Sequence, residues 1–172
     1  MKKYKVALFI GRFQPFHMGH LWEVEEAEKL ADAVVVGIGS SNVSGTADNP
    51  WDYETRKKMI EQATYNSGIM IREIIAIPDT PSDEEWVKNV EFSIFNFQFS
   101  KKDVVVLGNN EWVNELLEKA GFAVHRSGFY NRDELEGVQI RKMIREGSKE
   151  WKRRVPESVD RLIGKSASQL VS

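Results

Sequence analysis

The sequence predicts an α/β protein with a parallel sheet, because short β-branched segments alternate with amphipathic helical segments along the chain. Strands are expected at residues 5–10, 33–39, 71–77, 103–108 and, more weakly, 123–126. Helices are expected at residues 19–30, 52–66, 84–97, 111–120, 138–146 and 156–163. Ser82 followed by Glu85 predicts a capping box at a helix start, and Gly121 predicts a helix stop. A doubly wound sheet of this kind binds its ligand at the carboxyl ends of its strands.

Length and composition narrow the class of protein. The 172 residues are expected to form one domain, residues 1–172, with a frayed tail of small polar residues at 165–172. The chain has no cysteine and only three histidines, which argues against a disulfide scaffold and against a zinc site. No signal peptide or long apolar run is present, so we expect a cytoplasmic protein without a membrane partner. A net charge of −2 disfavours a nucleic-acid partner.

One ten-residue segment is the most informative part of the chain. It reads Gly11-Arg12-Phe13-Gln14-Pro15-Phe16-His17-Met18-Gly19-His20 and lies where the first expected strand leads into the first helix. His17 and His20 are three residues apart, so they share one side of the first helical turn, and Arg12 adds a permanent cation. A helix start also offers free N–H groups and the positive end of its dipole. Since turn chemistry requires only Gly, Pro or an Asx residue, the combination predicts a phosphate site.

The segment resembles the signature of the HxGH nucleotidyltransferase superfamily, and in this wording it is most similar to archaeal-type nicotinamide mononucleotide (NMN) adenylyltransferases. The similarity extends from the first strand to about Ile163. Shorter forms of the motif also occur in class I aminoacyl-tRNA synthetases and pantetheine-phosphate adenylyltransferases. The resemblance implies a Rossmann-like, doubly wound, five-stranded sheet of order 3-2-1-4-5 with the motif at its switch point.

The resemblance also implies a reaction. ATP and NMN would be joined to give NAD and pyrophosphate, with Mg²⁺ bridging charge on the leaving group, in an enzyme that forms a homo-oligomer. The attacking phosphate is already an anion, so positioning and charge neutralisation suffice and no general base is needed. Nicotinic acid mononucleotide is a further possible substrate. Two alternatives stay open: a different small-molecule adenylyltransferase, such as one that uses phosphopantetheine, and a nucleotide-binding sensor that has lost turnover.

The resemblance assigns roles to particular residues. Four residues are expected to act on the phosphates at the reacting centre: His17, His20, Arg12 and Arg141. Further contacts to ATP are expected from Gly11, Phe13, Gln14, Phe16, Gly19, Asn109, Arg132, Gly137 and Val138. The mononucleotide is expected to meet Ser40, Asp79 and Trp86. Trp86 would stack on the cationic nicotinamide ring, although a buried core position explains a Trp equally well. No residue is assigned as a metal ligand.

The second motif departs from the family pattern. It reads Glu136-Gly137-Val138-Gln139-Ile140-Arg141, where the family has hydroxyl residues at the positions of Glu136 and Val138. Hydroxyl groups at a helix start donate to phosphate oxygens or cap the helix, and Val138 can do neither. A carboxylate at Glu136 would repel a triphosphate unless it points away or helps to hold Mg²⁺. This departure is what motivates the sensor alternative.

Overall fold

One parallel sheet forms the centre of the computed structural model, which describes residues 2–170 and the side chains of residues 2–165. The strands within this range follow the order β3-β2-β1-β4-β5, as expected. They span Tyr4–Gly11 (β1), Ala31–Ile38 (β2), Ile71–Ala76 (β3), Val104–Leu107 (β4) and Ala123–His125 (β5). The central strand β1 pairs with β2 on one side and β4 on the other, so the carboxyl end of β1 is the switch point of the sheet.

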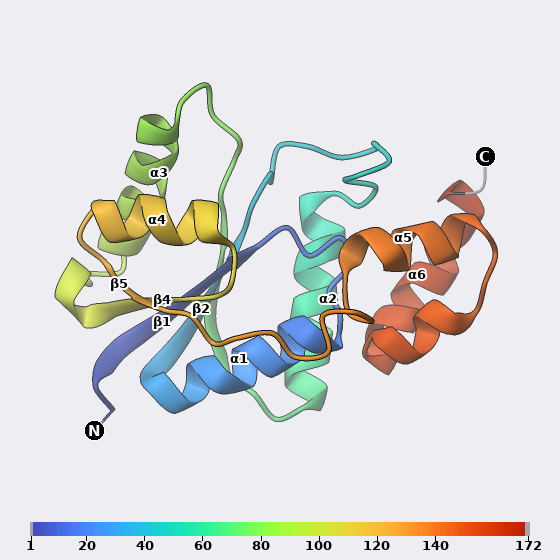
Figure 1. Ribbon diagram of the computed structural model, residues 1–172, viewed down its shortest axis with the longest axis horizontal. Coiled ribbons are helices and arrows are strands. Elements are labelled where there is room, and N and C mark those ends of the chain that lie inside the picture. Colours follow the sequence, from blue (N-terminus) through green and yellow to red (C-terminus); the bar gives the residue numbers. More distant parts are fainter. Residues whose placement is uncertain (1, 171–172) are drawn as a thin grey trace.

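Helices cover both faces of this sheet (Figure 1). One face carries α1 and α2, with α5 and α6 extending that layer, while α3 and α4 lie on the other face. The helices span Met18–Leu30 (α1), Tyr53–Asn66 (α2), Asp83–Phe95 (α3), Glu111–Lys119 (α4), Gly137–Arg145 (α5) and Glu157–Leu170 (α6). Two short 3-10 helices, Lys101–Asp103 and Glu150–Arg154, were not expected, because a single turn carries no periodic signal.

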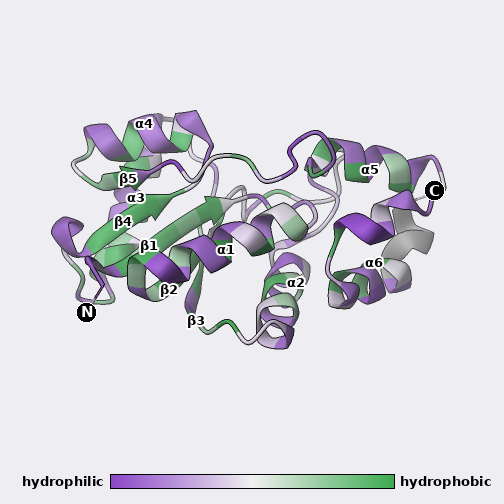
Figure 2. Cartoon of the chain, turned by 60° about the horizontal axis from the view of Figure 1, so that its bottom comes forward, coloured by the Kyte–Doolittle hydropathy of each residue, from purple (hydrophilic) through white to green (hydrophobic). Residues whose placement is uncertain are grey.

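The two faces have separate apolar cores because side chains alternate along each strand. In β1, Ala7 and Phe9 pack toward α1 and α2, whereas Val6 and Leu8 pack toward α3 and α4. Figure 2 shows β1 and β4 as largely hydrophobic strands, while the helices carry hydrophilic residues on part of their surface. A parallel sheet covered on both faces requires this kind of strand.

The helix ends follow local chemistry. Ser82 caps α3, since its hydroxyl accepts from the Glu85 N–H at 3.2 Å, and Gly121 ends α4 with a φ of +94°. α6 continues to Leu170, beyond its expected end at 163, because no residue after Gly164 interrupts a helix. The tail expected to fray is therefore helical as far as Leu170, and residues 171–172 lie outside the described part. No helix between residues 2 and 170 is long and apolar enough to cross a membrane.

Candidate active site

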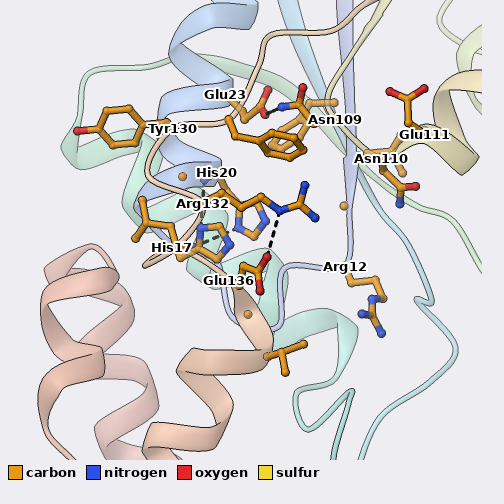
Figure 3. Close-up of a pocket in the computed structure, with 18 residues that line it drawn as sticks. Arg12, His17, His20, Glu23, Asn109, Asn110, Glu111, Tyr130, Arg132 and Glu136 are labelled. Atoms are coloured by element: carbon orange, nitrogen blue, oxygen red, sulfur yellow. Dashed lines mark hydrogen bonds and ion pairs between the residues drawn. The ribbon is translucent and has the colours of Figure 1, made fainter.

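A cleft of about 880 Å³ opens at the carboxyl end of β1 (Figure 3). Its walls come from the end of β1, the first turn of α1, the start of α4 and the segment 129–138 that leads into α5. Of the residues expected at the site, those that line the cleft are Gly11, Arg12, His17, Gly19, His20, Asn109, Arg132, Gly137 and Val138. The cleft thus joins two motifs that are more than a hundred residues apart in the sequence.

The two motif histidines start α1. His17 is the N-cap and His20 the third helical residue, and each Nδ1 accepts from the backbone N–H of the other residue, at 3.3 and 3.2 Å. This is a capping box built from two imidazoles in place of the usual hydroxyl and carboxyl groups. The rings stack with their centroids 3.5 Å apart. Gly19 permits this packing, because a Cβ there would lie 3.0 Å from the His17 ring.

The capping bonds decide which nitrogen of each imidazole carries a proton. A nitrogen that accepts from a backbone N–H is unprotonated, so the neutral ring bears its proton on Nε2. Burial lowers the pKa of His17 to about 4. Burial, together with the charge of His17, lowers the pKa of His20 well below its ordinary value. At neutral pH both rings are therefore uncharged, and each has an Nε2–H that the capping box leaves free to donate.

Aromatic side chains hold the imidazoles from behind. Phe13 and Phe16 are buried and lie 4.9 and 5.5 Å from the His20 ring, centroid to centroid. Gln14 is also buried, and its amide forms two hydrogen bonds with the backbone of Trp51, at 2.8 and 3.1 Å. These three residues were expected to contact ATP, but the motif turn directs their side chains into the core. They support the cleft and do not line it.

Three arginines gather near the end of β1. Arg12 is exposed and lines the cleft, and its positive charge helps to lower the pKa of both Arg56 and Arg141, for which burial is the larger cause. Arg56 is fully buried and donates to the carbonyls of Arg12, Gly39 and Ser40 at 2.9, 2.8 and 3.0 Å. It thereby fixes the ends of β1 and β2 relative to each other. Sequence reasoning missed Arg56.

Arg141 lies behind the cleft wall, not on it. Its guanidinium donates to the Gln14 carbonyl at 2.8 Å and pairs with Asp48 at 3.3 Å, and its buried Nε has no hydrogen-bond partner within the described residues. Gly137 permits the approach of α5, since a Cβ there would lie 3.0 Å from the Gln14 carbonyl oxygen and 3.1 Å from Arg141 Nη1. Arg141 therefore joins α5 to the first motif in this structure.

The segment before α5 carries another ion pair, Arg132–Glu136, and both of its residues line the cleft. The Arg132 Nε donates to a Glu136 carboxylate oxygen at 3.0 Å, and the Arg132 guanidinium carbon lies 4.0 Å from the centroid of the Phe129 ring. Glu136 is the N-cap residue of α5, but its side chain makes no capping hydrogen bond. Val138 follows on the cleft surface and is 59% exposed. Glu136 thus points to an arginine of the cleft.

Asn109 links three parts of the fold. Its side-chain nitrogen donates to Glu23 and Ser127 at 2.5 and 3.1 Å and to the Gly128 carbonyl, while its oxygen accepts from the Gly128 N–H at 3.0 Å. Ser127 donates to the same Glu23 carboxylate at 2.5 Å. Burial raises the pKa of Glu23, and the two hydrogen bonds oppose that rise. Asn109 lines the cleft, but both ends of its amide are bonded to the protein.

The residues expected to meet the mononucleotide lie around the ends of β2 and β3. The Ser40 hydroxyl donates to the Asp79 carboxylate at 2.9 Å, so the structure brings these two residues together. Trp86 is only 4% exposed and packs against Trp112 with ring centroids 4.8 Å apart. None of the three residues lines the cleft. In this structure Trp86 is part of the core between the sheet and α3.

The sequence is similar to those of known proteins over most of its length. Residues 8–146 match the cytidylyltransferase-like family. Relatives from Methanothrix thermoacetophila, Archaeoglobus fulgidus and Picrophilus torridus, each named nicotinamide-nucleotide adenylyltransferase, are 36, 36 and 37% identical over 155, 162 and 158 residues. These matches cover 90 to 91% of this chain and 86 to 89% of the relatives. The chain belongs to the nicotinamide-nucleotide adenylyltransferase family.

Solved structures share the fold of this adenylyltransferase. A bifunctional NMN adenylyltransferase/ADP ribose pyrophosphatase from Francisella tularensis, crystallised with AMP and a manganese ion, matches with a TM-score of 0.81 and 22% identity. The match covers 98% of this chain and 52% of that protein, so the chain spans about half its length. A NadR protein in complex with NAD and AMP-PNP matches with a TM-score of 0.65 and 19% identity, over 95% of this chain and 48% of that one.

Several residues in and around the cleft were not expected from the sequence. In α2 the buried positions Arg56, Met59, Ile60 and Ala63 have the spacing of an apolar helix face, so the charged Arg56 within that pattern was an available signal. Glu23 is likewise a charged residue that lies among the buried residues of α1. Ser127, Phe129 and Tyr130 lie in an irregular segment whose path the sequence does not reveal.

Proposed function

We propose that this adenylyltransferase transfers the AMP part of ATP to the 5′-phosphate of NMN, giving NAD and pyrophosphate. A phosphate oxygen of NMN forms a bond to the α-phosphorus of ATP, and the bond between that phosphorus and the oxygen bridging to the β-phosphorus breaks. The electron pair of the broken bond leaves with pyrophosphate. No proton has to be removed from the attacking oxygen, so the chain needs to orient the two phosphates and to offset their charge.

The observation that carries the proposal is the stacked pair of neutral imidazoles at the start of α1. His17 and His20 are locked in one tautomer by the capping box, so both can present Nε2–H groups to phosphate oxygens without reorganisation. Arg12 adds a cation that lines the same cleft and has no acidic partner among the described residues. Hydrogen bonds to charge that develops in the transition state are a large source of rate enhancement.

We propose that Mg²⁺ enters this cleft as the partner of ATP. Among residues 2–165 no group of three or more metal-ligating side chains is placed to hold an ion. Proteins commonly bind Mg²⁺ through substrate phosphates with one or two carboxylates. MgATP is therefore the substrate that we propose, with the ion neutralising the leaving pyrophosphate.

The mononucleotide is proposed to bind near the ends of β2 and β3, where Ser40 and Asp79 are joined. Trp86 can reach a nicotinamide ring only if its own packing against Trp112 changes, because it is 4% exposed. We propose that NMN is the substrate. Nicotinic acid mononucleotide is the second acceptor to test. We also propose that the enzyme is cytoplasmic and forms a homo-oligomer.

A pyrophosphate-release assay tests this function directly. The full chain is incubated with ATP and Mg²⁺ and with NMN, nicotinic acid mononucleotide or phosphopantetheine in parallel reactions, and each product is identified by mass. NAD formation supports the proposal. Dephospho-coenzyme A as the sole product would support the phosphopantetheine alternative. ATP binding without product from any acceptor would support a sensor.

A further inference from the structure

The carboxylate of Glu136 lies in the cleft with the residues that we propose bind phosphate. It pairs with Arg132 at 3.0 Å, and both residues line the cleft beside the two imidazoles (Figure 3). Phe129 packs against the Arg132 guanidinium and so restricts where that cation can lie. Phe129 and Glu136 thus hold Arg132 in the cleft, and the Glu136 carboxylate offsets its positive charge.

The other acidic residues on the cleft wall have different partners. Glu23 accepts from Asn109 and Ser127, and Glu111 is paired with Arg126 at 3.0 Å. Only Glu136, among the described carboxylates that line the cleft, is paired with an arginine that also lines it. Its side chain does not cap α5, although it stands at the N-cap position. The start of α5 and the Arg132 guanidinium both attract a negative charge. The Glu136 carboxylate binds the guanidinium and not the helix start.

We propose that Glu136 is a built-in competitor of the nucleotide phosphates. Its carboxylate holds Arg132 while the cleft is free of nucleotide, and the triphosphate takes over Arg132 when ATP binds. The side chains of the pair are 56% and 40% exposed, and an ion pair of such exposure is weak enough for a polyanion to replace it. Glu136 then sets the affinity for ATP. This inference rests on the proposed function, because it takes ATP as the ligand of the cleft.

The experiment measures the dissociation constant of MgATP by calorimetry for the full chain and for Glu136→Gln, Arg132→Ala and the double variant. Glu134→Gln is the matched control, because it removes the same charge from the same segment at an exposed residue outside the cleft wall. We expect Glu136→Gln to bind MgATP about fivefold more tightly, the upper range for releasing an exposed ion pair. Glu134→Gln should bind as the wild type does.

The double variant separates the ion pair from simple repulsion. If Glu136 competes for Arg132, the gain from Glu136→Gln shrinks to about twofold when Arg132 is already Ala, because only the repulsion of the phosphates is then removed. Inorganic tripolyphosphate, titrated in the same way, should show the same pattern without an adenosine group. Thermal melting of each variant confirms that it is folded.

Two results overturn the inference. Unchanged binding by Glu136→Gln would show that the pair does not oppose ATP. Weaker binding, with a higher Mg²⁺ requirement, would show that Glu136 helps to hold the metal ion. The proposed function is checked separately by NAD formation in the wild type. Tighter binding by Glu136→Gln without NAD formation would support the competitor role and overturn the proposed acceptor.

Discussion

Replacing Arg56 with Met should destabilise the fold and the cleft together. The guanidinium is fully buried and donates to three loop carbonyls, and for two of them, those of Arg12 and Gly39, no other hydrogen-bond donor lies within the described residues. A buried carbonyl left without a donor costs about 1–3 kcal/mol, and removing the buried charge offsets part of this. We expect a net loss of about 3 kcal/mol, which for a chain of this length lowers the melting temperature by about 10 °C.

The assay is differential scanning calorimetry combined with steady-state kinetics well below the melting temperature. Arg56→Lys is the control, since it keeps the charge but loses the planar fork of donors. We expect kcat/KM to fall at least tenfold in Arg56→Met, because the Arg12 carbonyl and the β2 end lose their common anchor. A melting temperature within about 2 °C of the wild type would refute the reasoning, since no more than about 1 kcal/mol would then be lost.

Substitutions at three other residues test the site. His20→Ala should lower kcat about a hundredfold while circular dichroism stays close to that of the wild type, by analogy with losing one transition-state donor. His17 has a pKa lowered to about 4 in the folded chain, so the unfolded chain binds more protons between about pH 6.5 and 4, and stability should fall across that window as the pH drops. Melting temperatures should show a shallower fall in His17→Asn, and an identical fall would contradict this origin. Trp86→Ala should lower stability by about 3–5 kcal/mol, the cost of emptying a buried aromatic site. If Trp86 also contacts nicotinamide, Trp86→Phe will raise the KM for NMN more than the KM for ATP. Equal changes in the two KM values would show that Trp86 acts only in the core.

The sheet was predictable because its pattern is carried by short-range sequence. Strands β1 to β4 each contain a short segment rich in Val, Ile or other apolar residues, and every expected strand and helix occurs within a few residues of its predicted bounds, except for the end of α6. The strand order came from the family resemblance, since alternation alone does not rank the strands. The 3-10 helices escaped because one helical turn has no period to detect.

The position of the cleft in the fold was predictable, but its geometry was not. Phe13, Gln14 and His17 belong to the same sequence motif. Only the fold shows that the side chains of Phe13 and Gln14 are buried in the core while that of His17 lines the cleft. Phe13 has a φ of +54°, a backbone region that a non-glycine residue rarely adopts. The residue type therefore gives no sign of this turn in the sequence. Likewise, the partners of Asn109 and Glu136 depend on contacts between distant segments, for which a single sequence carries no direct signal.

The hydrogen bond between Gln14 and Arg141 spans 127 positions of the chain and joins the first motif to the last quarter of the sequence. During synthesis the β1 end and both motif histidines leave the ribosome before α5, which lines the other side of the cleft and follows more than a hundred residues later. A growing or truncated chain that stops before residue 137 therefore carries the complete first motif beside an open, half-built cleft. The cleft is finished only after the start of α5 has been made.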